Sequence, residues 1–163
     1  MRNKNMKYDR KKKLSQHFTL WEFIRSETAT KRGIDNEDIT PVQLTNMQAL
    51  CENVLEPVRQ HFEVPIHISS GYRCTALNKA VGGAPKSQHM KGQAADIYIN
   101  APPLTLRDIY LWMVDNLSFD QIIWETRPSG SKWIHVSYQN EKANRQQVLR
   151  CEDGKHYLPF RAM

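Results

Sequence analysis

The apolar residues of the chain recur at two spacings, and the longest run at helical spacing follows residue 40. Thr40 suits a helix N-cap, Pro41 suits the first helical position, and Gln43 closes a capping box with Thr40. Apolar residues then keep helical spacing to about Phe62, at Leu44, Met47, Leu50, Val54, Leu55 and Val58. We therefore expect one core helix over residues 40–62, and its apolar stripe needs no ligand to explain it.

Two shorter segments also carry helical patterns. Thr19 and Glu22 form a capping-box pattern before a short helix that ends near Ile24, and a polar loop follows over residues 28–38. Thr105 caps a further helix, whose inward positions are Leu106, Ile109, Trp112 and Met113. Each segment has one apolar face, so each is expected to cover part of the core.

Strand patterns occupy much of the chain after residue 63. Residues 119–125 and 133–138 are expected to form a hairpin across the turn at residues 128–131. A Gly- and Pro-containing loop is expected over residues 78–86. Further strands are expected at residues 64–70, 96–99 and 147–150. The chain is therefore expected to be an α+β protein, with helices packed on one face of a small antiparallel sheet and a metal site on the other.

The net charge of the 163 residues is +6, and all of it lies at the N-terminus. Residues 1–13 hold seven basic residues and one acid, so residues 14–163 are neutral. We expect residues 1–16 to be a basic, disordered tail and residues 17–163 to form a single domain. Such a tail can bind nucleic acid, anionic lipid or acidic wall polymers, or only aid solubility, and we favour the last alternative.

The cysteine content and the apolar runs bear on the compartment. Cys51, Cys74 and Cys151 are an odd number without paired spacing, which is typical of a reducing compartment. No apolar run approaches the roughly 20 residues that a membrane span needs. The N-terminus lacks the apolar stretch of a secretory signal, so we expect synthesis in the cytoplasm.

Residues 87–96 contain candidate functional side chains close together in sequence. This segment is expected to be a loop that runs into a strand. His89 and Asp96 stand seven residues apart, and Gly92 between them allows a tight backbone path. Small alanines at positions 94 and 95 leave room beside the two side chains. A neutral imidazole and a carboxylate are ligands that suit zinc, and a catalytic zinc ion needs a third protein ligand.

Strand alternation supplies the candidate for that third ligand. His135 lies opposite the apolar face of its strand, Asp96 lies opposite Ile97 and Ile99, and Glu125 lies opposite Ile122 and Trp124. If the apolar faces all pack against helices, these three polar residues share the other face of the sheet. The pattern thus predicts a site with His89, Asp96 and His135 as ligands and Glu125 as a nearby unligated carboxylate.

Each of these residues also has an ordinary structural interpretation. His135 and His89 are also explained as polar residues of a strand and a loop, and Asp96 as the cap of a turn. Glu125 is also explained as half of an ion pair at the hairpin end, with Arg127 or Lys132. Spacing alone leaves these alternatives open.

The motifs together resemble a known family. Residues 87–96 follow the pattern S-x-H-x-x-G-x-A-x-D, residues 133–135 follow W-x-H, and residues 69–73 read S-S-G-Y-R. This combination resembles the zinc D-alanyl-D-alanine carboxypeptidase family, which includes phage endolysin peptidases and shares its fold with Hedgehog domains. The resemblance covers about residues 18–138.

The resemblance implies a zinc cofactor and assigns roles to several residues. Arg73 matches an arginine that stabilises charge on the substrate carbonyl, and Ser87 matches a serine at the substrate-binding edge, with Tyr72 in the same motif as Arg73. The zinc ligands that it implies are His89, Asp96 and His135.

One position departs from part of the family. Several members carry the catalytic acid three residues before the last histidine, where this chain has Lys132. A charged lysine cannot accept a proton. Glu125 resembles a carboxylate at the end of the preceding strand in the shorter branch of the family, so we expect Glu125 to be the general base.

The function implied is hydrolysis of peptide bonds in peptidoglycan stem peptides, by a D,D-carboxypeptidase or an endolysin-type endopeptidase. We expect a monomer that reaches the cell wall by export or lysis. The alternative is a non-catalytic, zinc-stabilised binding module for cell-wall or protein ligands. A nucleic-acid partner is not expected, because the domain outside the basic residues is neutral.

Overall fold

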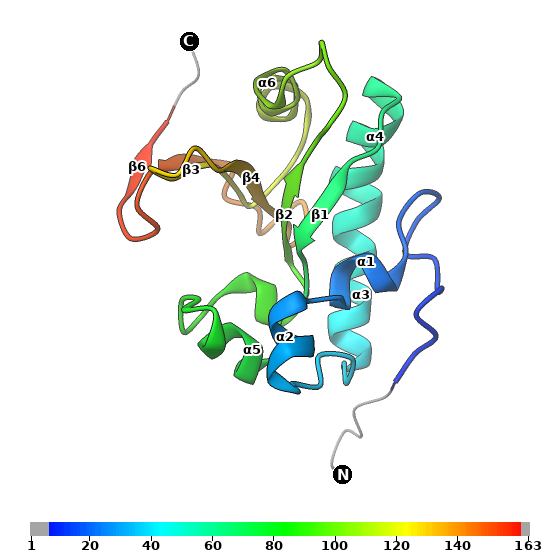
Figure 1. Cartoon of the computed structure of the whole chain (residues 1–163). Coiled ribbons are helices and arrows are strands. Elements are labelled where there is room, and N and C mark those ends of the chain that lie inside the picture. The colour runs from blue at the N-terminus through cyan, green and yellow to red at the C-terminus, as the bar shows by residue number, and fades with distance from the viewer. Residues whose placement is uncertain (1–6, 161–163) are drawn as a thin grey trace.

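The computed structural model of the chain describes residues 7–160 and has an α+β fold built on one mixed sheet (Figure 1). The sheet has six strands in the order β1-β2-β4-β3-β5-β6. Its strands are β1 (His67–Ser70), β2 (Ala94–Tyr98), β3 (Gln121–Thr126), β4 (Lys132–Ser137), β5 (Gln147–Cys151) and β6 (Tyr157–Pro159). All neighbours are antiparallel except β3 and β5, which run parallel. The expected α+β class with a mostly antiparallel sheet is confirmed.

Helical segments surround this sheet. They are α1 (Leu20–Ile24), α2 (Glu27–Arg32), α3 (Pro41–Leu50), the π-helical turn η1 (Cys51–Leu55), α4 (Glu56–Phe62), α5 (Thr75–Ala80), the 3₁₀ turn η2 (Gln88–Lys91) and α6 (Leu106–Asn116). Within residues 7–160, none of them is long and apolar enough to cross a bilayer.

The expected core helix over residues 40–62 is present, with one irregular turn. The hydroxyl of Thr40 accepts a hydrogen bond from the Gln43 amide, and the Gln43 side chain closes the capping box. The helix continues through α3, η1 and α4, and η1 widens it between Cys51 and Leu55. Pro57 lies in the first turn of α4 and has no amide hydrogen to donate. A wider turn just before a proline accommodates the missing donor and the pyrrolidine ring.

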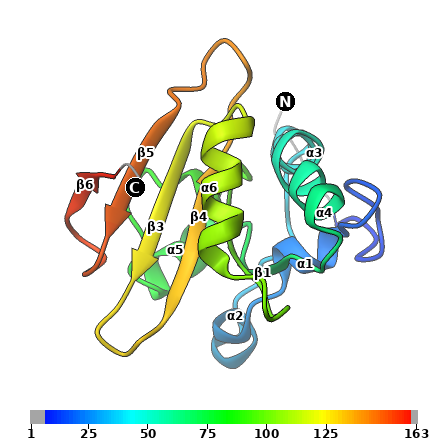
Figure 2. The same cartoon turned by 90° about the horizontal axis from the view of Figure 1, so that it is seen from above.

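The two faces of the sheet carry different layers. Seen from above, α6 lies on one face, α3 and α4 stand beside the sheet, and α5 lies under the other face (Figure 2). The residues that alternation assigned to the apolar face are buried there, including Ile97, Ile122 and Ile134. The ring of Trp124 contacts Tyr110 of α6 at a centroid distance of 5.3 Å. The opposite face carries the polar members of the same strands and a small apolar cluster of Ile123, Leu149 and Cys151.

Helices α2 and α5 fall where the sequence indicated loops. Each has only six residues, which is too short for a clear apolar period. The hydroxyl of Ser26 caps α2 by accepting from the Ala29 amide, and Gly33 ends it at φ +64°. Both helices are fixed by local caps and by contact with each other rather than by an apolar stripe.

The N-terminal segment from residue 7 is part of the fold, which corrects the expected disordered tail over residues 1–16. Leu14 is 3% exposed and belongs to the main core. The Lys12 carbonyl accepts a hydrogen bond from the Leu20 amide at 2.9 Å. Arg10 pairs with Glu37 and stacks over the Trp21 ring at 4.5 Å. Long basic side chains pack their stems on apolar surface, so a high charge did not mean disorder here. Residues 1–6 lie outside the described part.

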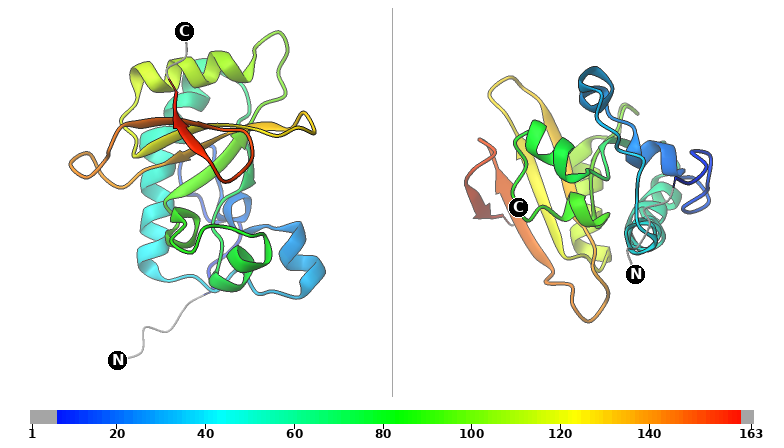
Figure 3. Two further views of the ribbon diagram at one scale, coloured as in Figure 1. Left: turned by 90° about the vertical axis from the view of Figure 1, so that its left-hand side faces the viewer. Right: turned by 90° about the horizontal axis from the view of Figure 1, so that it is seen from below.

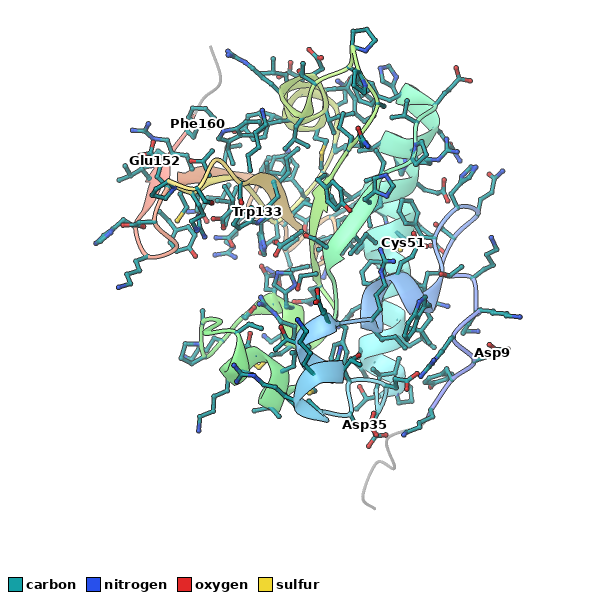
Figure 4. All side chains as sticks on the ribbon, viewed as in Figure 1. Asp9, Asp35, Cys51, Trp133, Glu152 and Phe160 are labelled. Atoms are coloured by element: carbon teal, nitrogen blue, oxygen red, sulfur yellow. The ribbon has the colours of Figure 1, made fainter. Side chains whose placement is uncertain are left out.

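The three cysteines are free thiols. Cys51 is buried where α3 passes into η1 (Figure 4), and burial raises the pKa of its thiol well above its usual value. Cys74 caps α5 by accepting from the Leu77 amide, and Cys151 packs in a small second cluster. Each cysteine therefore has a packing or capping role.

Candidate metal centre

Three ligand-type side chains meet on the face of the sheet opposite α6. Asp96 on β2 pairs directly with His135 on β4, so their side chains leave the same face side by side. His89 reaches them from η2, the turn that leads into β2. One ligand atom from each residue lies within 4.8 Å of the others. Within residues 7–160 this is the group of side chains that could hold a metal ion.

The spacing of these atoms fits a small divalent cation. Nε2 of His89 lies 3.4 Å from Oδ1 of Asp96, and Nδ1 of His135 lies 3.0 Å from the same oxygen. A tetrahedral zinc ion with bonds of about 2.1 Å holds its ligand atoms about 3.4 Å apart. The donor set of two imidazoles and one carboxylate is therefore compatible with zinc and leaves a fourth position open.

The backbone around His89 fixes the orientation of its ring. Nδ1 of His89 donates a hydrogen bond to the carbonyl oxygen of Gly71 at 2.7 Å, which leaves Nε2 as the atom that faces Asp96. The Ser87 hydroxyl accepts from the His89 amide at 3.2 Å and caps η2. Ser87, which the family resemblance placed at the substrate edge, thus also shapes the loop that carries His89.

Gly92 is required where η2 passes into β2. Its φ is +72°, and a Cβ at this position would lie 2.6 Å from the carbonyl oxygen of Gln43. The close approach lets α3 hold the loop, because Gln43 Nε2 donates to the Met90 carbonyl and Asn46 Nδ2 donates to the Lys91 carbonyl. The core helix thus positions the first ligand.

The protonation states favour ligand binding at neutral pH. Burial lowers the pKa of His89, against the opposing effect of Asp96, so its imidazole is neutral. Burial of Asp96 raises its pKa, but its electrostatic and hydrogen-bond interactions with His89 and His135 outweigh this effect. The pKa of Asp96 therefore lies well below its usual value, and the carboxylate is ionised.

A buried carboxylate supports the same loop from the other side, and no motif in the sequence indicated this role. Asp120 is fully buried just before β3 and accepts hydrogen bonds from Gln88 and Arg145. Nη2 of Arg145 lies 2.7 Å from Oδ2 of Asp120, and Nε2 of Gln88 lies 3.0 Å from the same oxygen. Because Gln88 is adjacent to His89, this network ties the ligand loop to β3. No local signal links residues 25 positions apart.

Glu125 is buried on the ligand face, as alternation predicted. It is 6% exposed, and it lies in the strand next to that of His135. Oε2 of Glu125 accepts a hydrogen bond from Arg127 at 3.0 Å, and Arg127 also stacks over Trp133 at 4.7 Å. Burial raises the pKa of Glu125, although Arg127 acts in the opposite direction. The site therefore holds a buried carboxylate with a raised proton affinity, in addition to the ion pair expected as an alternative.

Arg73 and Tyr72 differ in their positions. Nε of Arg73 is buried without a hydrogen-bond partner among residues 7–160, and the side chain lines a groove with Arg25 of the α1–α2 connection, Ser70 and Leu77 of α5. Tyr72 is 5% exposed and lies in the main core, and burial raises its pKa to about 12. The Tyr72 phenol is therefore largely a core group, although the residue also borders the groove, and its expected role in substrate binding stays a prediction.

Comparison with known families matches this geometry to one of them. Residues 16–137 match the family Peptidase M15. The chain belongs to the peptidase M15 family. This is the zinc D-Ala-D-Ala carboxypeptidase family, so the resemblance seen in the motifs is confirmed. A direct comparison with curated proteins gives no match.

The M15 family is a family of metallopeptidases, and this chain has a candidate metal site at His89, Asp96 and His135. The matched region contains all three residues, Arg73 and Glu125. It ends with β4, so β5 and β6 of this M15 peptidase lie beyond it.

Proposed function

We propose that this M15 peptidase uses zinc to hydrolyse peptide bonds in the stem peptides of peptidoglycan. The observation that carries the proposal is the convergence of His89, Asp96 and His135 on the sheet face that also buries Glu125. Peptide stems with D-amino acids are the substrate class that the family suggests.

Three protein ligands suit a catalytic rather than a structural zinc ion, because structural sites are usually closed by four. A bound zinc ion supplies Lewis acidity, which lowers the pKa of a water molecule toward about 7 and polarises a carbonyl group. The two histidines and Asp96 would hold the ion, and the hydrogen bond to the Gly71 carbonyl keeps the His89 ring in its ligand tautomer.

Glu125 and Arg73 have separate roles in the reaction, the first in proton transfer and the second in charge stabilisation. Glu125 accepts a proton from water as the water oxygen attacks the peptide carbonyl carbon, and then donates that proton to the leaving amine. A raised pKa suits a group that must both take up and release a proton. The guanidinium of Arg73 stabilises negative charge on the carbonyl oxygen, and no group in the described part of the chain, residues 7–160, accepts a hydrogen bond from its buried Nε.

A groove next to the centre offers room for the substrate chain. It runs between α2 and α5 and is lined by Arg25, Ser70 and Arg73. Because Ser70 pairs with Asp96 across β1 and β2, the groove begins beside the metal ligands. We place the acyl part of the stem peptide here, with Ser87 at the edge of the binding surface.

One observation favours a second function, a non-catalytic zinc-stabilised binding module. Arg127 forms an ion pair with Glu125 at 3.0 Å, and this pair would have to open or shift before Glu125 could serve as a base. In a binding module the same pair would be purely structural.

Defined stem peptides separate the two functions. We expect the zinc-loaded protein to release D-alanine or to cut a cross-linked stem, with products identified by mass. The matched control is Glu125→Gln, which should bind zinc but lose turnover. Stoichiometric zinc without turnover on linear or cross-linked stems would favour the binding module.

The remaining assignments concern where and in what state the protein acts. We propose that it is a monomer, that it is made in the cytoplasm, and that it reaches the wall by export or lysis. Sedimentation of the purified protein tests the monomer, and fractionation of producing cells tests the route.

A further inference from the structure

The last two strands form a hairpin that reaches the ligand face from beyond the family match. β6 pairs with β5, and Tyr157 lies directly opposite Cys151, which in turn pairs with Glu125 of β3. Directly paired residues project from the same face of a sheet. Tyr157, Cys151 and Glu125 thus form one row on the face of the metal ligands. Figure 3 shows β6 on the same side of the molecule as α5.

The turn of this hairpin is held in one conformation. Oδ1 of Asp153 accepts hydrogen bonds from the amides of Lys155 and His156, both at 2.8 Å. The Gly154 amide donates to Sγ of Cys151 at 3.2 Å. These contacts close the turn without help from the rest of the chain, so β6 has a fixed starting point.

The same turn rests against the ion pair of the centre. Gly154 has φ +77°, and a Cβ at this position would lie 3.1 Å from Nη2 of Arg127. Arg127 is in turn bonded to Glu125 at 3.0 Å. The hairpin is therefore docked on the Glu125–Arg127 pair, and Tyr157 follows three residues after the docking point.

The Tyr157 hydroxyl is an available donor in this position. The residue is 47% exposed, and among residues 7–160 no group accepts a hydrogen bond from its hydroxyl. Burial of part of the ring raises the pKa of Tyr157, and Glu125 and Asp96 act in the same direction. The phenol also interacts electrostatically with the Arg73 guanidinium. It is therefore a neutral donor on the sheet face that carries Asp96 and Glu125.

We propose that Tyr157 contacts the substrate and donates a hydrogen bond to the scissile carbonyl oxygen as negative charge develops there. The inference rests on the proposed peptidase function and adds a second donor to Arg73. Arg73 follows β1 at one edge of the sheet, whereas Tyr157 belongs to β6 at the other edge. A substrate between the two edges meets a donor from each. The C-terminal hairpin is thus a functional part of the catalytic surface.

Removal of the Tyr157 hydroxyl oxygen tests whether this residue donates to the substrate. Tyr157→Phe removes the donor and keeps the ring, and Tyr98→Phe is the matched control. Tyr98 is 40% exposed on the same sheet face and stacks on His67. Loss of one oxyanion donor typically lowers kcat by about 10²-fold. We expect Tyr157→Phe to lower kcat on a stem peptide by roughly 10- to 100-fold with KM within about twofold, and with zinc content and Tm unchanged. Wild-type kcat, or an increase in KM alone, would overturn the proposal.

A second measurement does not depend on turnover. A phosphinic dipeptide carries a tetrahedral, charged group in place of the scissile carbonyl, and its affinity for the zinc-loaded protein can be measured by calorimetry. We expect Tyr157→Phe to weaken this affinity about tenfold, the scale of one hydrogen bond to a charged group, and Tyr98→Phe to leave it unchanged. Equal affinities for all three proteins, or no binding, would reject the role of Tyr157. If the wild type binds the compound but cuts no stem peptide, the peptidoglycan assignment fails while the donor role stands.

Discussion

The ring of His89 is tied to the backbone of Gly71 by a hydrogen bond of 2.7 Å from Nδ1 to the carbonyl oxygen. The bond joins the end of β1 to the η2 turn, two segments 18 residues apart in sequence. It selects the tautomer in which Nε2 is free, and it sets the direction in which that atom points. The geometry of the candidate metal centre therefore depends on where β1 ends.

This dependence predicts that Gly71→Ala lowers both the stability of the fold and the affinity for zinc. The new Cβ would lie 2.7 Å from Cα and the carbonyl oxygen of Phe23, and backbone atoms cannot move away easily. We expect a loss of about 2 kcal/mol or more in the free energy of unfolding, as for overpacked sites, and at least tenfold weaker zinc binding by competition with a chromogenic chelator. Gly130→Ala is the control, because nothing lies within 4 Å of its Cβ and only its φ of +91° opposes the change. Equal zinc affinity in the two variants would show that the Gly71 contact does not support His89.

The ligand set predicts a metal stoichiometry. We expect about one zinc ion per chain in the wild type and a large loss in His135→Ala, because two ligands with an open site bind zinc poorly. Elemental analysis after dialysis gives the number, and His67→Ala is the control, because His67 is a half-buried histidine that stacks on Tyr98. Full zinc content in His135→Ala would remove this residue from the ligand set.

The pKa of Glu125 predicts the acid limb of the activity profile. As a base, Glu125 must be ionised, so kcat/KM should fall as the pH drops through its pKa, which burial raises above the usual value. Arg127 lowers this pKa, so Arg127→Ala should move the acid limb to higher pH. Glu125→Gln should lower kcat by roughly 10²-fold or more with zinc content unchanged. An acid limb that stays in place in Arg127→Ala would assign it to another group.

The Asp120 network predicts a stability effect at low pH. Burial raises the pKa of Asp120, but hydrogen bonds from Arg145 dominate and lower it to about 2. The unfolded chain therefore binds this proton at higher pH than the native chain does. The stabilisation is complete above about pH 4 and is lost as the pH falls through about 2. Arg145→Ala should cost about 1–3 kcal/mol at pH 7, the cost of a buried acceptor without its partner.

Denaturant titrations of the wild type and Arg145→Ala at pH 7 and pH 3 test the network. Arg32→Ala, at an exposed position at the end of α2, is the control for loss of a surface charge. If the wild type and Arg145→Ala respond equally to acid, Asp120 does not depend on Arg145 for its low pKa.

The packed N-terminal segment predicts that residues 7–13 contribute to stability. The Arg10 side chain forms an ion pair with Glu37 and stacks over the Trp21 ring. The Arg10 carbonyl oxygen also accepts a hydrogen bond from the Trp21 amide. Deletion of residues 1–13 should lower Tm by several degrees, because a loss of about 1 kcal/mol shifts Tm by about 2–4 °C in a domain of this size. Arg10→Ala should reproduce part of the loss, and Lys11→Ala should not. An unchanged Tm after the deletion would show that these contacts add no net stability.

Much of the fold follows from local chemistry, which is why the sequence could predict it. The capping boxes at Thr40 and Thr105 fix where two helices begin, because both partners lie within one turn of each other. Alternation in β2, β3 and β4 assigned Asp96, Glu125 and His135 to one face, because a strand has a strict period of two. The motif at residues 87–96 then indicated the family.

Other features depend on contacts between distant segments, and only the tertiary structure decides them. The parallel pairing of β5 with β3 and the Asp120–Arg145 bond join residues with no local relation in sequence. The basic segment from residue 7 was expected to be disordered, yet it packs because Glu37 and Trp21 offer it partners. Tyr157 belongs to a strand of three residues, too short to show a period, and reaches the face of the candidate metal ligands only through the register of β3, β5 and β6. Local pattern determines which face a side chain takes, whereas pairing between strands determines which side chains meet.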